Sequence, residues 1–282
     1  MGAVGDKNSR AAAFRGRSFR PSYIYIAFML IVMYLPIAFV IVYSFNASKL
    51  TSVWGGFTLG WYADLFRDRS MFEALRNSLV LGVTSSMAAG VVGTLSANGL
   101  ARARVAGGGA MSYLSTLPIM IPEIILGMVF LAFFSLIGLP FGIATLFIAH
   151  TAFSIPYVFL MVKARLAGLE KCYEEAARDL GAGAARAFFD VTLPMTAPAI
   201  ASGMLLAFAM SFDDVIISVF VTGVNYNTLP IKIYSQLKTG VTPKTNALCA
   251  LLFAAAAALG LASAWISRPK TNTATSSAGG KV

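Results

Sequence analysis

Three carboxylates lie inside stretches of sequence that are otherwise apolar: Glu123, Asp213 and Asp214. An ionisable side chain in such a stretch is costly in lipid, so each is a functional hypothesis by default. Spaced carboxylates suit a cation that carries more than one ammonium group, and aromatic faces add cation–π contacts to such groups. The aromatic candidates are Tyr34, Tyr157 and Phe212. The chemistry predicted from these residues is the binding of a small organic cation.

The expected depth of these acids places them near one another. Measured along the helix from the inner end of its expected span toward the outer side of the membrane, Glu123 lies at about 20 Å and Asp213 at about 24 Å. Both depths fall in the outer half of a hydrocarbon core about 30 Å thick. Neighbouring helical residues point about 100° apart, so only one of Asp213 and Asp214 should face a shared vestibule, and the sequence leaves open which. The alternative is structural: an aspartate that pairs with a neighbouring span or subunit or lies at the outer interface, or a glutamate that serves a helix broken at Pro122.

His150 is the only histidine, and it lies in the middle of an apolar stretch. A proton relay would need partners, and none is recognisable in the sequence, so we expect a packing residue whose hydrogen bonds are satisfied. The chain has no G-x-x-x-x-G-K-[ST] loop, no Cys/His cluster with zinc spacing and no nucleophile motif. We therefore expect no catalytic residue, no metal site and no cofactor in this chain.

The elements that must position these residues are membrane helices. Hydrophobic residues make up 57% of the 282-residue chain and charged residues 12%, against roughly 25% charged in soluble domains. Runs of about 20 apolar residues predict transmembrane helices. We expect an all-α integral membrane protein with six of them, at about 23–45, 77–100, 110–137, 141–162, 197–221 and 247–266. The second is rich in small residues, which let helices pack closely.

The basic residues predict how the chain is oriented. With both termini inside, the inner segments hold fifteen Lys and Arg residues and the outer loops seven. Cytoplasmic loops carry the excess of positive charge, so both termini should be cytoplasmic, and the net charge of +10 needs no nucleic-acid partner. We expect a disordered basic tail at 1–20, a membrane domain at 21–268 with a cytoplasmic loop at 163–196, and a second disordered tail at 269–282.

The loop at 163–196 is the longest charged stretch between spans. It predicts a helix from about Tyr173 that Gly181 stops, followed by a second short helix that ends at Leu193–Pro194 before the fifth span. A helix–Gly–helix bracket of this kind suits docking into a groove on a partner protein.

The same loop resembles a known signature. Glu175-Ala176-Ala177, three residues, Gly181, nine residues and then Val191-x-Leu193-Pro194 is similar to the EAA signature of ABC-importer permeases, with Val191 where the family usually has Ile. Other segments resemble the second permease of spermidine/putrescine importers, and the similarity covers roughly residues 20–268. These segments are 54–62, 77–79, 121–123, 211–214, 228–234, 240–243 and 246–248.

The resemblance implies a fold, partners and roles. It implies the type I ABC-importer permease architecture in a bacterial inner membrane, and polyamine import by alternating access. ATP and Mg would be bound by two separate ATPase subunits, beside a second homologous permease and an extracytoplasmic substrate-binding protein. The bracket would couple ATP-driven motion through residues Glu174, Glu175, Ala176, Ala177, Asp179, Gly181, Leu193 and Pro194.

Two other functions stay open. The same importer role could serve another small substrate, such as an amino-acid derivative or a phosphonate, although the carboxylates favour a cation. An ion-coupled secondary carrier or a membrane enzyme would need no ATPase, and therefore no bracket. The substrate, the identity of the partners and the conformational state cannot be read from the sequence.

Overall fold

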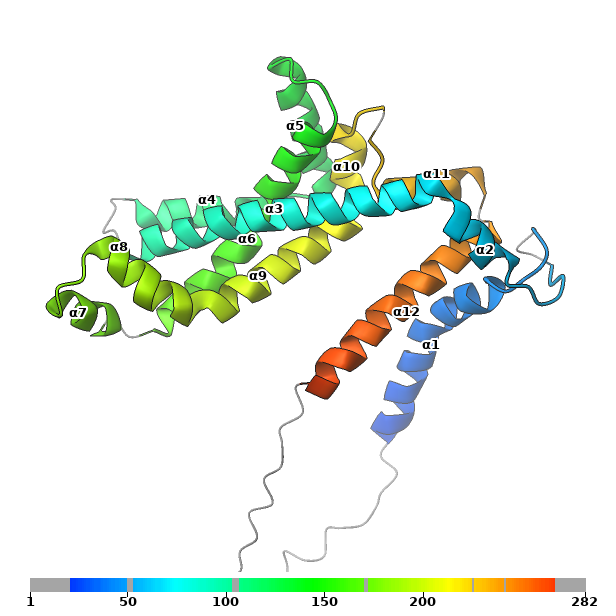
Figure 1. Cartoon of the computed structure of the whole chain (residues 1–282), viewed down its shortest axis with the longest axis horizontal. Helices are drawn as coiled ribbons and strands as arrows, with labels where there is room; N and C mark the ends of the chain where they lie inside the picture. Colours follow the sequence, from blue (N-terminus) through cyan, green and yellow to red (C-terminus); the bar gives the residue numbers. More distant parts are fainter. Residues whose placement is uncertain are drawn as a thin grey trace, which may run out of the picture. The chain divides into compact units, whose positions relative to one another are not determined.

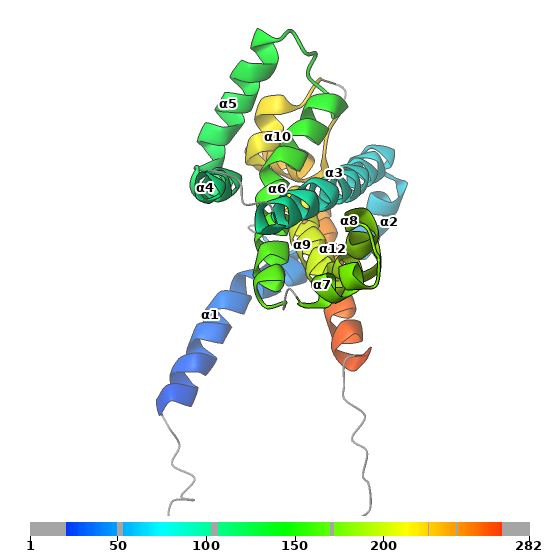
Figure 2. The ribbon, with the colours of Figure 1, turned by 90° about the vertical axis from the view of Figure 1, so that its left-hand side faces the viewer.

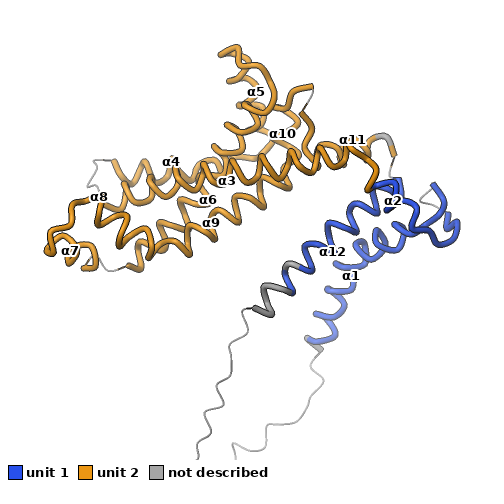
Figure 3. Tube along the Cα trace, viewed as in Figure 1, with its two compact units in different colours: residues 1–65, 242–282 blue, residues 66–241 orange. Residues whose placement is uncertain are grey.

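The computed structural model describes residues 21–49, 53–102, 107–169, 172–224, 226–240 and 242–266, and both predicted tails lie outside these ranges. Apart from one isolated bridge between Asn46 and Phe57, the regular elements of these residues are helices, so the all-α prediction is confirmed. The chain forms two compact units, one of residues 1–65 and 242–282 and the other of residues 66–241 (Figure 3).

The first unit contains α1 (Pro21–Tyr43), most of α2 (Gly60–Arg67) and α12 (Pro243–Ile266). Helices α1 and α12 contact each other (Figure 1). The loop after α1 is organised by the buried side chain of Asn46, which donates to the carbonyl of Val53 at 2.7 Å and accepts from the amide of Gly55 at 2.7 Å. The indole of Trp61 donates to the Asn46 carbonyl at 2.8 Å, which ties the start of α2 to this loop.

The second unit holds the remaining helices, and its core lies between three long ones. These are α3 (Arg69–Arg102), α6 (Ile143–Ala167) and α9 (Leu193–Asp213), which pack against one another (Figures 1 and 2). The others are α4 (Gly108–Met120), α5 (Glu123–Leu136), α7 (Cys172–Asp179), α8 (Ala184–Ala187), the π-helical turn η1 (Phe188–Thr192), α10 (Ile216–Val221) and α11 (Leu229–Thr239).

Glycines allow the three long helices to approach closely. A Cβ atom added at Gly93 of α3 would lie 2.9 Å from the Cβ atom of Val158 and 3.0 Å from the amide nitrogen of Phe159 on α6. One added at Gly203 of α9 would lie 2.9 Å from the Cα atom of Val158. Glycines therefore let both α3 and α9 approach α6 closely at Val158, and the approach of α3 agrees with the small-residue content predicted for the second span.

The spans agree with the prediction in part. The described residues contain four helical stretches long and apolar enough to cross a membrane: Tyr23–Tyr43, α3, α6 and Ala184–Asp213. The predicted third span consists of α4 and α5, which meet at an angle of 105°, and α12 contains a shorter apolar helix. The count of six spans and the orientation of the termini stay predictions.

The fifth span differs from its predicted bounds of 197–221. The long helix ends at Asp213, where Asp214 turns to an extended backbone, and the short α10 follows from Ile216. The prediction of one unbroken helix through Asp213 and Asp214 was wrong. The physical cause is local: the Asp214 carboxylate accepts hydrogen bonds from the amides of Ile217 and Ser218 in the first turn of α10, which gives the chain a new helix start at this point.

Candidate functional site

The bracket helix α7 ends as the sequence predicted. Gly181 has a φ of +86°, which only glycine adopts at little cost. Its amide donates to the carbonyl of Arg178 at 2.9 Å, and the amide of Ala182 donates to the carbonyl of Ala177 at 3.0 Å. These two hydrogen bonds form a Schellman motif, which satisfies the carbonyls at the helix end. The predicted stop at Gly181 is confirmed.

The second half of the bracket corrects the prediction at Leu193–Pro194. These residues begin α9 rather than ending a helix, and the chain is helical from Ala184 through η1 to Asp213. A proline inside an α-helix clashes with the carbonyl four residues earlier. The wider π-helical turn of residues 188–192 directly precedes Leu193, and it offers the local adjustment that lets the helix continue through Pro194.

Glu174 faces the body of the second unit. Its carboxylate accepts hydrogen bonds from Arg102, at the end of α3, and from Arg178, one turn along α7, the latter at 3.1 Å. Arg102 also donates to the hydroxyl of Thr192 in η1 and lies over the ring of Phe188, 5.9 Å from its centroid. Arg102 and Thr192 could not be recognised as site residues from the sequence. Arg102 lies 72 residues from Glu174 along the chain, and Thr192 lies 90 residues from Arg102.

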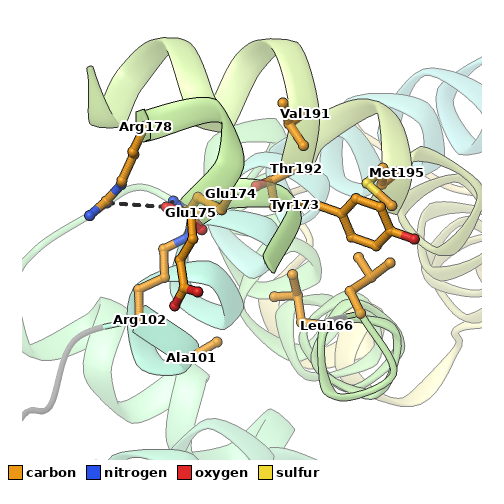
Figure 4. Close-up of a pocket in the computed structure, with 11 residues that line it drawn as sticks. Ala101, Arg102, Leu166, Tyr173, Glu174, Glu175, Arg178, Val191, Thr192 and Met195 are labelled. Carbon is orange, nitrogen blue, oxygen red and sulfur yellow. Dashed lines mark hydrogen bonds and ion pairs between the residues drawn. The ribbon is translucent and has the colours of Figure 1, made fainter. Parts of the chain in front are cut away.

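A pocket of about 250 Å³ opens beside this cluster. Figure 4 shows Glu174 and Arg178 on one side of it and Tyr173, Leu166 and Met195 on the other. The lining residues are Ala101, Arg102, Leu166, Leu169, Tyr173, Glu174, Glu175, Arg178, Val191, Thr192 and Met195. The pocket therefore lies where the ends of α3 and α6 meet the bracket.

Other bracket residues are exposed to solvent, and of these Glu175 also lines the pocket. Glu175, Ala176 and Asp179 are exposed, and the side chain of Leu180 is 90% exposed. An apolar side chain and acidic side chains are therefore exposed side by side at the end of α7. Of the predicted coupling residues, Glu174 is the inner one, and Glu175, Ala176 and Asp179 are exposed. Together with Leu180, which the sequence did not single out, these three exposed residues form what we call the outer face.

Asp214 has a structural role at the break in the fifth span. Its Oδ1 accepts from the amide of Ile217 at 3.1 Å, and its Oδ2 accepts from the amide of Ser218 at 2.8 Å and from the Ser218 hydroxyl at 2.7 Å. The side chain is 4% exposed. Among the alternatives left open by the sequence, the structure favours the structural one for Asp214.

His150 joins the two sides of this break. Its Nδ1 lies 2.7 Å from the hydroxyl of Ser211 on α9, and its Nε2 lies 2.9 Å from the hydroxyl of Ser218 on α10 and 3.4 Å from Oδ2 of Asp214. The imidazole is completely buried. The expectation of a packing histidine with satisfied hydrogen bonds agrees with this geometry. Its partners lie 61 and 68 residues away, which is why no relay pattern was visible.

The remaining path candidates lie on exposed or half-buried positions. Asp213 is exposed, and Phe212 stacks on Phe208 with 5.7 Å between ring centroids. Glu123 is the exposed first residue of α5, close enough to the half-buried Tyr157 for an electrostatic interaction. In the described part of the chain, no hydrogen bond joins Glu123 to either aspartate. Tyr34 is exposed on α1, in the other unit.

Comparison with known proteins decides the family. The family described as "Binding-protein-dependent transport system inner membrane component" matches residues 89–268, which include the bracket and the broken span. The chain belongs to this family. Membership makes it an inner-membrane transport component, and the matched region contains both sites described above.

Individual relatives agree with that assignment. The chain is 40% identical over 235 residues to the putrescine transport system permease protein PotI of Escherichia coli K12, a match that covers 81% of this chain and 84% of the relative. It is 39% identical over 239 residues to the spermidine/putrescine transport system permease protein PotC of the same organism, covering 85% of this chain and 90% of the relative.

Two solved structures share the fold. A chain of a bacterial ABC transporter involved in the import of the acidic polysaccharide alginate matches with a TM-score of 0.67 at 16% identity, covering 90% of this chain and 98% of that one. A chain of an amino acid ABC transporter matches with a TM-score of 0.52 at 17% identity, covering 74% and 98%. At these identities the likeness concerns the fold, and it supports the predicted permease architecture.

Proposed function

We propose that the chain is the permease subunit of an ATP-driven polyamine importer, and that it works by alternating access powered by separate ATPase subunits. The observation that carries the importer role is the bracket, whose short helix α7 turns an acidic and apolar face outward. A transporter that needed no ATPase would have no use for such a surface. The names of the two relatives, which refer to putrescine and spermidine, support the substrate class.

The outer face of the bracket is the proposed docking site for an ATPase subunit. A short helix with an exposed leucine beside Glu175 and Asp179 suits insertion into a groove, because the leucine loses water on docking while the acids bind polar or basic groups at the rim. ATP and Mg are bound on that partner in this proposal. A second homologous permease and an extracytoplasmic binding protein complete the assembly.

The substrate path of the proposal runs past Asp213. This carboxylate is exposed in the isolated chain, whereas its neighbour Asp214 is buried in hydrogen bonds. Glu123 and Tyr157 form a second pair of acid and aromatic ring, which can hold an ammonium group by charge and by cation–π contact. Two such points suit the two separated charges of a diamine.

The test uses the assembled complex in proteoliposomes, with ATP supplied to the ATPase side and radiolabelled putrescine or spermidine added with the binding protein. We expect saturable, ATP-dependent uptake, and we expect Glu175→Ala to reduce both uptake and stimulated ATP hydrolysis by about tenfold. Glu73→Ala, which removes an exposed glutamate of α3 outside the bracket, is the matched control.

The outcomes separate the two parts of the proposal. Normal uptake by the Glu175→Ala complex would reject the proposed role of the bracket in coupling. A complex that hydrolyses ATP under stimulation but takes up no polyamine would keep the importer and reject the substrate. The remaining candidates would then be other small solutes, such as an amino-acid derivative or a phosphonate.

A further inference from the structure

One guanidinium group joins three elements at the inner end of the bracket. Arg102 is the last residue of α3, and its two terminal nitrogens donate to different partners. One donates to the carboxylate of Glu174 on α7, and the other donates to the hydroxyl of Thr192 in η1. The same group lies over the ring of Phe188, at the start of η1. The planar fork of an arginine presents donors on separate nitrogens in a fixed geometry, and its flat face can stack on an aromatic ring, whereas a lysine ammonium is a compact point charge.

This cluster is more shielded from solvent than the other ion pairs of the bracket. The side chains of Arg102 and Glu174 are 24% and 22% exposed, whereas Arg178 is 53% exposed and the pair Arg186–Asp190 is 78% and 63% exposed. Exposed pairs contribute little, because water and salt screen them. Removing Arg102 has a larger effect, because it leaves Glu174 with only the exposed Arg178 as a charged partner and leaves the Thr192 hydroxyl without its arginine donor. The Arg102 cluster is thus the ion pair of the bracket with most influence on its position.

Arg102 connects the bracket to a helix that does not adjoin it along the chain. Helix α7 is connected along the chain to α6 and, through α8 and η1, to α9. It has no such connection to α3, which packs against both of those helices in the core. The contacts of Arg102 supply a link between the bracket and the end of α3, and they reach the bracket on both sides of Gly181.

We propose that Arg102 is a positioning residue that locks the bracket onto α3, so that a displacement of α7 moves α3 together with α9. The role in transport rests on the proposed function, whereas the lock itself is a property of this chain. Glu174 is, in this assignment, the inner anchor of the bracket, while the outer face remains available to the partner. Thr192 ties the π-helical turn to the same guanidinium.

The first test measures the lock without any substrate. Hydrogen exchange of the amides of residues 172–182 is followed in the assembled complex, for wild type, Arg102→Gln and the control Arg186→Gln, which removes an exposed ion pair from the same bracket. We expect the exchange of α7 amides to rise about tenfold in Arg102→Gln, because local opening becomes easier, and to stay unchanged in the control. Unchanged exchange in Arg102→Gln overturns the proposal.

A charge exchange separates a specific contact from a general loss of folding. Arg102→Glu places two acids against each other and should increase exchange of α7, and Glu174→Arg added to it should bring the exchange back toward wild type. Failure of the double variant to recover, in a complex that assembles normally, counts against pairing between the two residues as the basis of the lock.

The second measurement concerns transport, and its outcome is independent of the hydrogen-exchange result. In proteoliposomes, we expect Arg102→Gln to raise the number of ATP molecules hydrolysed per polyamine imported, by about fivefold or more, while the ATPase subunits still copurify. An unchanged ratio overturns the coupling role. If the wild-type complex imports no polyamine, the proposed function fails, and the exchange experiment still decides whether Arg102 locks the bracket.

Discussion

Two adjacent acids, Asp213 and Asp214, have different environments. Asp214 accepts hydrogen bonds from Ile217 and Ser218 and lies next to His150, whereas Asp213 remains exposed at the end of α9. The difference arises because the helix ends between them, so that the two side chains are no longer related by a regular helical step. Only Asp213 is available to a substrate in this arrangement.

Their asparagine variants should therefore behave differently. We expect Asp213→Asn to raise the KM for polyamine uptake about tenfold without changing thermal stability, because it removes an exposed charge that would bind the cation. Asp214→Asn should lower the melting temperature of the purified complex instead, because it weakens the cap of α10. Uptake kinetics and a thermal-shift assay on the same preparations check both. Equal loss of uptake in two equally stable variants would contradict the assignment.

His150 stabilises the break between α9 and α10 through a network of buried hydrogen bonds. Replacement with leucine leaves the hydroxyls of Ser211 and Ser218 with fewer partners in a buried site. We expect His150→Leu to destabilise the protein by roughly 3 kcal/mol, since buried polar groups that lose partners carry their full desolvation penalty. His150→Gln, which retains hydrogen-bonding capacity, should be affected less. Thermal unfolding in detergent measures the difference, and similar stabilities for the two variants would argue against the network.

At the scale of elements, the bracket depends on one backbone conformation. Gly181 has a φ of +86° and ends α7 with two hydrogen bonds. A β-branched residue there would be strained, by about 1–2 kcal/mol. We expect Gly181→Val to reorient α7 and to reduce stimulated ATP hydrolysis and uptake, while membrane insertion stays intact.

A second glycine gives the control for that substitution. Gly168 ends α6 with a φ of −91°, and a Cβ atom there would make only an ordinary contact, 3.7 Å from the carbonyl of Arg165. Gly168→Ala should therefore retain stimulated ATP hydrolysis. Full activity of Gly181→Val would show that the coupling mechanism tolerates a displaced α7.

At the scale of the whole molecule, the orientation of the chain can be tested through a natural thiol. Cys172 is exposed at the start of α7, whereas Cys249 in α12 is half-buried. In a Cys249→Ser background, a membrane-impermeant maleimide should label Cys172 in inverted membrane vesicles and not in right-side-out ones, because the bracket is predicted to be cytoplasmic. Labelling only in right-side-out vesicles would reverse the predicted topology.

Features that depend on a local pattern of residues could be predicted without the structure. The apolar runs predicted helices, the signature from Glu175 to Pro194 predicted the bracket, and Gly181 predicted its end, because a left-handed backbone position selects glycine whatever surrounds it. The break after Asp213 also has a local signal, because Asp214 is a residue type that favours the start of a new helix. The apolar run concealed it, since hydrophobicity alone favours one continuous span.

Contacts between side chains that are distant in the sequence became known from the fold alone. Arg102 reaches Glu174 and Thr192, and His150 reaches Ser211 and Ser218, across 61 to 90 residues of chain. The spacing of residues within one helix cannot predict such pairs, because the pairs arise from the packing of α3, α6 and α9 against one another at small residues. For the same reason, the sequence identified Asp213 with Asp214, and Glu174 with Glu175, as candidate residues without distinguishing the members of either pair. The packing of the helices shows that Asp214 and Glu174 are the more buried members.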